Sequence, residues 1–275
     1  MTEMVTYAYA VVRPAEGLDV ALSGIQGVAE APVRLLAPDE PRSAPAAAVS
    51  SVPSQDFQED ALRRHLEDLD WLEAVARAHH SVIEILAAHT TALPLRLATV
   101  YLDDARVART LRDDTDAFSH ALKRLAGHLE WGVKIYVEPK PEPQTRPAPV
   151  AAGTTEGLSP GRAYLRARRS QRLSRDESYQ AARQAAARVE AIGSAMAAGH
   201  ARHRVQQGEL SVGTGENVVN DAYLLTRETA ADFRTRILDA VRDLPDVRID
   251  VTGPWAPYSF ADPPEAQPPV PDLAP

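Results

Sequence analysis

The histidines are the residues whose type and spacing could bind a metal ion. His79 and His80 are adjacent, with His89 further along, and His200 lies three residues before His203. Adjacent residues on a helix point in different directions, whereas residues three apart share a face. Neither group has a carboxylate at a recognised metal-ligand spacing. We therefore predict no metal site, and we interpret these histidines as solvent-exposed or helix-end residues.

Carboxylates and glycines could support acid–base chemistry or nucleotide binding. Asp103-Asp104 and residues 113–116 place carboxylates at the start and middle of a helix, where we interpret them as solvated faces. Gly213-Thr214-Gly215 begins like a dinucleotide fingerprint, but the third glycine is missing, and Glu216 would bring negative charge towards a pyrophosphate. The chain has no P-loop, and the lack of cysteine excludes thiol catalysis and zinc-thiolate sites. The sequence predicts no catalytic residues and no cofactor.

One run of basic residues could attract nucleic acid or an acidic protein. Its members are Arg162, Arg166, Arg168, Arg169, Arg172 and Arg175, with Tyr164 among them. On a helix they spread around much of the cylinder, and the aromatic stacking platforms of RNA-binding proteins are absent. We therefore expect no nucleic-acid partner, and we favour salt bridges to the acidic remainder of the chain or to an acidic partner.

Composition indicates a soluble globular protein. The chain has 275 residues, 44% hydrophobic and 25% charged, and a formal net charge of −8 that disfavours nucleic acid and anionic lipid. No apolar stretch approaches the roughly 20 residues that span a bilayer, so we expect no membrane partner. The N-terminus lacks the form of a secretory signal, so we expect a cytoplasmic protein. The length suits two domains, each with its own core.

The elements of the first half alternate between strands and helices. We expect strands at residues 5–12, 33–37 and 46–52, and a turn or short helix at 17–27. From Asp56 the apolar residues recur at helical spacing, which predicts either two helices or one helix broken near residue 70. Asp56 with Glu59, and Asp70 with Glu73, are predicted to cap these helices. One apolar stripe contains Val75, His79 and Ile83. A strand at 95–101, a long helix carrying residues 107–129 and a strand at 131–137 close this domain.

The second half is predicted to start with a long helix. Residues 160–207 are rich in alanine and arginine, which favour helices. A strand at 222–226 and a helix from Thr229 follow, and residues 247–251 alternate like a half-buried strand. Gly253-Pro254 is expected to turn the chain, so that Trp255 and Tyr258 fold back onto the second domain.

Prolines mark the expected domain boundaries. We expect an α+β domain at 1–138, a proline-rich linker at 139–159, a smaller α+β domain with a long helix at 160–260 and a disordered proline-rich tail at 261–275.

Five apolar-aromatic blocks carry a resemblance to a known family. They are LPLRLATVY at 93–101, EWGVKIYV at 130–137, GRAYLRARR at 161–169, NDAYLLTR at 220–227 and TGPWAPYSF at 252–260. Together with WLEAVARAHHSVIE at 71–84, and in this order and spacing, they resemble the gas vesicle protein F/L family (GvpF/GvpL). The chain departs from the family pattern at Leu97-Ala98, at Ala256 and at Ala10, which are changes in packing or turn chemistry.

The resemblance implies an accessory protein of gas vesicle assembly with no reaction and no cofactor. It implies two α+β domains, the first with a modified ferredoxin-like fold. It also implies binding to the small hydrophobic shell protein GvpA, protection of GvpA from aggregation during vesicle nucleation, contact with other accessory proteins and a place as a minor vesicle component. An uncharacterised α+β enzyme or small-ligand-binding protein is the alternative.

Twelve residues of the blocks are candidates for either the cores or a partner surface. They are Leu93, Pro94, Arg96, Trp131, Gly132, Tyr136, Tyr223, Gly253, Pro254, Trp255, Tyr258 and Phe260. The sequence leaves the choice open for the set. For Trp131 and Trp255 we favour the core, because tryptophans on strands usually bury most of their apolar area.

Overall fold

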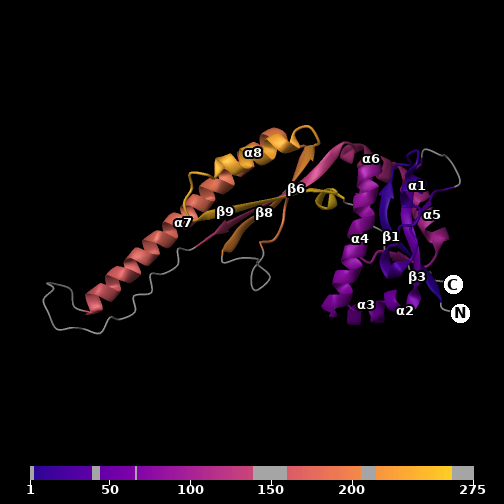
Figure 1. Cartoon of the computed structure of the whole chain (residues 1–275), viewed down its shortest axis with the longest axis horizontal. Helices are drawn as coiled ribbons and strands as arrows, with labels where there is room; N and C mark the ends of the chain where they lie inside the picture. The colour runs from indigo at the N-terminus through magenta and orange to yellow at the C-terminus, as the bar shows by residue number, and fades with distance from the viewer. Residues whose placement is uncertain (1–2, 39–43, 66, 139–159, 206–214, 262–275) are drawn as a thin grey trace, which may run out of the picture. The chain divides into compact units, whose positions relative to one another are not determined.

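The chain forms two units, each with a sheet and helices of its own (Figure 1). The structure, a computed structural model, describes residues 3–38, 44–65, 67–138, 160–205 and 215–261. Unit 1 contains the described residues up to Glu130 and those from Pro254 onward, and unit 2 is Trp131–Gly253. The α+β prediction is confirmed. The expected linker, and the expected tail beyond Ala261, lie outside the described residues.

The sheet of unit 1 has its strands in the order β2–β3–β1–β4, and β5 also pairs with β1. Their bounds are β1 (Met4–Val12), β2 (Arg34–Leu36), β3 (Ala46–Pro53), β4 (Ala92–Pro94) and β5 (Val100–Tyr101). β1 pairs antiparallel with β3, and the register shifts between Ala8 and Ala10. Because a bulge adds one residue to a strand, Tyr7, Tyr9, Ala10 and Val12 all belong to one core.

Helices cover this sheet. They are α1 (Leu18–Leu22), α2 (Ser54–Phe57), α3 (Glu59–His65), α4 (Leu69–His89), α5 (Asp104–Asp113) and α6 (Thr115–Leu125), with the 3₁₀ turns η1 (Val28–Glu30) and η2 (Tyr258–Phe260). Val75, Ile83 and Leu86 of α4 pack with Tyr7 and Tyr9 of β1 in the buried core. The element order strand–helix–strand–strand–helix–strand is the order expected of a ferredoxin-like unit, and the finer assignment to that fold stays a prediction.

The cap of α4 differs from the predicted capping pairs. The Asp68 side chain accepts hydrogen bonds from the backbone amides of Asp70 and Trp71, so Asp68 is the N-cap and Asp70 lies inside the helix. At α2 the N-cap residue is Pro53, and no side chain caps the helix. Asp56 lies inside α2 and Asp70 inside α4, so the caps predicted at these two residues were wrong, because an N-cap is fixed by the local backbone as well as by residue type.

Two predicted elements of unit 1 are divided. Residues 95–99 form a turn between β4 and β5, so only Val100 and Tyr101 of the predicted strand at 95–101 are extended. The Thr99 amide donates to the Arg96 carbonyl, and Ala98 takes a positive φ of 61°. The predicted long helix is α5 followed by α6, with Asp114 at the junction. Leu129, expected on that helix, lies in strand β6 (His128–Val137).

The sheet of unit 2 has the order β7–β8–β6–β9. The other strands are β7 (Gly199–Arg202), β8 (Glu216–Thr226) and β9 (Val247–Trp255), and the helices are α7 (Pro160–Met196) and α8 (Ala230–Ala240). The sequence predicts that residues 131–137 close the first domain, whereas β6 lies between β8 and β9 in this sheet. The predicted helix at 160–207 ends earlier, because the chain from Gly199 pairs with β8.

The core of unit 2 lies between its sheet and its two helices. Val133 and Ile135 of β6 pack with Ala185 and Val189 of α7 and with Phe233 of α8. The helical spacing of Phe233, Ile237 and Val241 was predicted, and all three are buried. None of the helices in the described ranges is long and apolar enough to cross a membrane.

Candidate functional site

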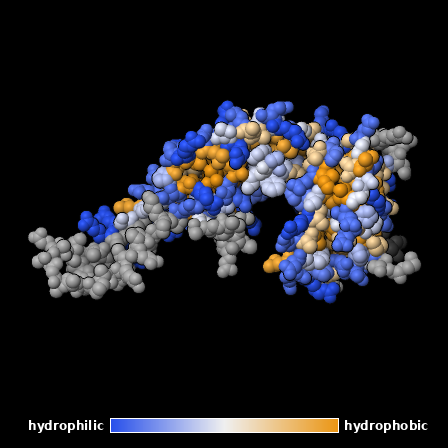
Figure 2. Space-filling model, viewed as in Figure 1, coloured by the Kyte–Doolittle hydropathy of each residue, from blue (hydrophilic) through white to orange (hydrophobic). Residues whose placement is uncertain are grey.

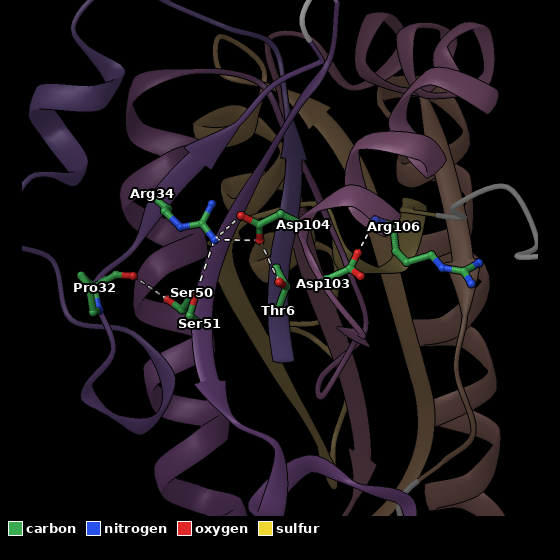
Figure 3. A network of polar contacts seen from close by, with 8 residues as sticks. All are labelled: Thr6, Pro32, Arg34, Ser50, Ser51, Asp103, Asp104 and Arg106. Carbon is green, nitrogen blue, oxygen red and sulfur yellow. Dashed lines mark hydrogen bonds and ion pairs between the residues drawn. The ribbon is translucent and has the colours of Figure 1, made fainter. Parts of the chain in front are cut away.

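A polar network joins three strands of unit 1 to the first turn of α5 (Figure 3). Asp104 accepts a hydrogen bond of 2.8 Å from the Thr6 hydroxyl and forms an ion pair of 2.8 Å with Arg34. Burial opposes ionisation of Asp104, but the hydrogen bonds from Arg34 and Thr6 lower its pKa below the usual range. Asp103 caps α5 by accepting from the Arg106 amide. Asp104 thus links β1 and β2 to α5, and Asp103 caps that helix, while both side chains stay exposed, as the sequence interpretation expected.

This ion pair is expected to contribute little to stability. The side chains of Arg34 and Asp104 are 40% and 49% exposed, so water and salt weaken their attraction. In a double-mutant cycle with Arg34→Ala and Asp104→Ala, the coupling free energy should be about 0.2–1 kcal/mol, as for other exposed pairs. Urea unfolding of the four proteins measures it. A coupling of several kcal/mol would show that the network is desolvated in solution.

A second polar group lies within the core of unit 1. The Tyr7 hydroxyl is 3.0 Å from Nδ1 of His79, and the Tyr9 hydroxyl donates to Ser50. Burial raises the pKa of both tyrosines, and burial lowers the pKa of His79 to about 4. A tyrosine beside a neutral histidine could exchange protons with a substrate, but Tyr7 is 0% and His79 3% exposed. Both side chains are buried, so this group contributes to the packing of the unit 1 core.

The histidines agree with the sequence interpretation only in part: His89 is exposed at the end of α4, as expected. His79 is buried, against the solvent-exposed interpretation, although its place in the apolar stripe of α4 is confirmed. His200 lies in strand β7 rather than on a helix, and its Nε2 is 3.0 Å from the Asp221 carboxylate. Among the residues that the structure describes, no three histidine, aspartate or glutamate side chains gather where they could hold a metal ion.

Half of the twelve candidate block residues are buried in the cores. Leu93, Pro94, Trp131, Tyr136, Tyr223 and Phe260 are buried. Leu93 and Pro94 pair with β1, and Arg96, in the turn that follows, is exposed. Gly132 leaves space for the Thr252 side chain, since a Cβ there would lie 2.8 Å from its hydroxyl oxygen. The blocks thus contribute mainly to packing.

The closing block, residues 254–261, is held in unit 1. The Glu130 carboxylate accepts two hydrogen bonds of 2.7 Å from the backbone amide and the hydroxyl of Ser259. The Tyr258 hydroxyl is 2.9 Å from Nδ1 of His80, and Arg124 donates to the Phe260 carbonyl. The prediction that this block folds onto the second domain was therefore wrong. The expected turn at Gly253 is also absent, because β9 continues to Trp255.

Trp255 is a surface residue, which corrects its predicted place in the core. It is 39% exposed, and its ring lies 5.5 Å from the ring of His80 on α4. Other large apolar side chains exposed on unit 1 are Met4, Val20, Leu69, Leu97 and Leu102. Figure 2 shows apolar side chains at the surface among hydrophilic ones. Trp255 with His80 and Tyr258 is the candidate partner-binding surface, which we call the Trp255 surface.

Comparison with known proteins identifies the family. The sequence model for "Gas vesicle synthesis protein GvpL/GvpF" matches residues 5–262. The chain belongs to the GvpL/GvpF family. It is 44% identical over 261 residues to gas vesicle protein L of Streptomyces sp. (strain CB03234), with 94% of each chain covered. The resemblance found in the sequence is thus confirmed, and the chain is a gas vesicle protein.

Solved structures of GvpF share the fold of this GvpL/GvpF chain. GvpF from Anabaena sp. PCC7120 matches with a TM-score of 0.61 and 19% identity, covering 95% of this chain and 97% of that one. GvpF from Microcystis aeruginosa matches with a TM-score of 0.59 and 17% identity, covering 94% and 98%. Family membership indicates an accessory or structural role in gas vesicles.

Proposed function

We propose that this GvpL/GvpF protein binds the hydrophobic shell protein GvpA in the cytoplasm and limits its aggregation while a gas vesicle forms. The observation that carries the proposal is the family match over residues 5–262. A shell subunit with exposed apolar surface and strand edges aggregates unless another protein covers it. Contact with other accessory proteins and a place as a minor vesicle component belong to the same proposal.

The Trp255 surface is our preferred contact for the shell protein. Tryptophan is enriched among the residues that contribute most to protein interfaces, and a ring with one face in water offers apolar area to a partner. The block is well anchored, since Glu130, His80 and Arg124 all hold it to unit 1. A fixed surface loses little conformational entropy on binding, which favours affinity.

If this protein protects GvpA by covering its apolar surface, the protection should depend on the molar ratio of the two proteins. When GvpA is diluted from denaturant, its light scattering should fall as this protein is added and should level off at a fixed molar ratio. A specific interface of this kind should bury on the order of 1,200–2,000 Å². An unrelated protein of similar mass serves as the control. If no ratio suppresses scattering and no complex survives size exclusion, the proposed function is wrong.

Trp255→Ser tests the location. Trp255→Ser removes a ring that is 39% exposed and otherwise packs near His80, so the thermal midpoint should fall, and the variant, at temperatures where it is still folded, should protect GvpA less. Leu173→Ser on α7 is the matched control, since Leu173 is also exposed, at 56%, and belongs to unit 2. Loss of protection in the Leu173 variant alone would move the contact to unit 2, without overturning the proposed function.

A further inference from the structure

β9 is an edge strand of the unit 2 sheet. The sheet order β7–β8–β6–β9 places β6 on one side of β9, and no other described strand lies beside its outer edge. β9 has nine residues, whereas β7, the strand at the opposite edge, has four. A long edge exposes unpaired backbone groups that can pair with another chain. Pro254 has no amide donor, which limits pairing to the residues before it.

The side chains of β9 leave apolar area at this edge uncovered. Val247, Ile249 and Val251 point to the helix-covered face and pack against the core of unit 2, but each is only half-buried. β6 and β8 also supply that core, and Val133, Ile135 and Leu225 in it are 0% exposed. A further strand beside β9 would cover the side chains of Val247, Ile249 and Val251, as neighbouring strands on both sides cover the apolar side chains of β6 and β8.

The opposite face of β9 is charged, and its charges are self-complementary. Arg248 lies over the Tyr136 ring at 3.9 Å, donates to Glu138 at 2.8 Å and also pairs with Asp250 of its own strand. Consider a second β9 placed antiparallel about Ile249. Arg248 of each copy then stands opposite Asp250 of the other, Val247 stands opposite Val251, and Ile249 meets Ile249. Opposite charges at directly facing positions stabilise an antiparallel pair, and like charges destabilise it.

We propose that β9 is a homodimer interface, at which two copies pair antiparallel through residues 247–251 and join their unit 2 sheets into one. Such a contact has twofold symmetry and closes on itself, so it yields a dimer and no longer chain. The second copy is the occupant that the charge pattern fits. A strand with the same charge sequence placed parallel would bring Arg248 opposite Arg248. The dimer goes beyond the proposed binding of GvpA and does not depend on it.

Sedimentation of the full chain tests the dimer. The average molecular mass measured by sedimentation equilibrium should rise from 29.8 kDa towards 59.6 kDa (2 × 29.8) as the protein concentration increases. Asp250→Arg places arginine opposite arginine at both ends of the pair, and the dissociation constant should rise on the order of tenfold. Arg248→Asp combined with Asp250→Arg restores opposite charges and should restore the dimer. Glu228→Arg, the same charge change outside β9, should leave the dimer unchanged.

Several outcomes would overturn the dimer. The unaltered chain could remain monomeric up to about 100 μM, a concentration at which even weak pairing is detected. Asp250→Arg could associate as strongly as the unaltered chain while its circular dichroism is unchanged. A chain that is monomeric alone and pairs only with added GvpA would assign the edge to a different partner. None of these results bears on whether GvpA scattering is suppressed, so the two proposals can fail separately.

Discussion

Replacing Gly193 with alanine should lower the free energy of unfolding by about 2 kcal/mol or more, although alanine is the better helix former. Gly193 lies on α7 where the Tyr223 ring of β8 packs against the helix. A Cβ at this position would lie 2.1 Å from Cε1 of Tyr223, so one of the two must move. The contact, and not a special backbone conformation, requires glycine here.

The Tyr223 ring has no free space to retreat into. It is 1% exposed, stacks on His200 at 4.8 Å with an interplanar angle of 6°, and lies 5.4 Å from the Phe233 ring. Overpacking of this kind typically costs about 1–3 kcal/mol, and the helix must shift from the sheet to relieve it. In an open position, alanine for glycine would instead stabilise a helix by up to about 1 kcal/mol.

Urea unfolding of matched variants measures the effect. Ser194→Ala changes the next residue of the same helix, which is exposed, and should be neutral or slightly stabilising. In a Tyr223→Leu background the penalty of Gly193→Ala should shrink, because the branched side chain leaves room near the helix. Equal losses in both backgrounds would mean that the glycine serves another purpose.

Periodicity in the sequence located the regular elements of both units, because core faces repeat with the period of the helix or strand. The stripe of α4 with Val75, His79 and Ile83 and the alternation of residues 247–251 are examples. Element ends were less predictable. The end of α7 at Met196 depends on pairing of residues 199–202 with β8, a partner that lies about twenty residues further along the chain.

The candidate surface was harder to predict than the fold. Trp255 follows an apolar strand and looks like a core residue, yet β9 continues through Gly253 and Pro254 and leaves its ring partly in water. The anchors that place the block, Glu130 and Arg124, are separated from it by more than a hundred residues. Local sequence holds no signal for such contacts, whereas the resemblance of the blocks to the GvpL/GvpF family was correct.

Acidification should destabilise the fold through His79, since burial lowers the pKa of this residue from 6.5 to about 4. The unfolded chain binds a proton at His79 below about pH 6.5, and the folded chain binds it only below about pH 4. Between these values protons favour the unfolded chain, so stability falls as the pH falls. From pH 7.5 to 4.5 this residue alone should remove roughly 2–3 kcal/mol.

Acidification also destabilises the fold by protonating carboxylates such as Asp104, whose pKa is lowered in the folded chain. The variant His79→Gln separates the contribution of His79 from that of the carboxylates. Glutamine keeps a polar side chain near the Tyr7 hydroxyl but cannot be protonated, so the variant should be less sensitive to pH between 7.5 and 4.5. His89→Gln is the matched control, because His89 lies on the same helix and is exposed. It should follow the unaltered protein at every pH, since its side chain lies at the surface and outside the buried core of unit 1. If all three proteins lost the same stability on acidification, His79 would have to take up its proton without unfolding, which requires water to reach the core between β1 and α4.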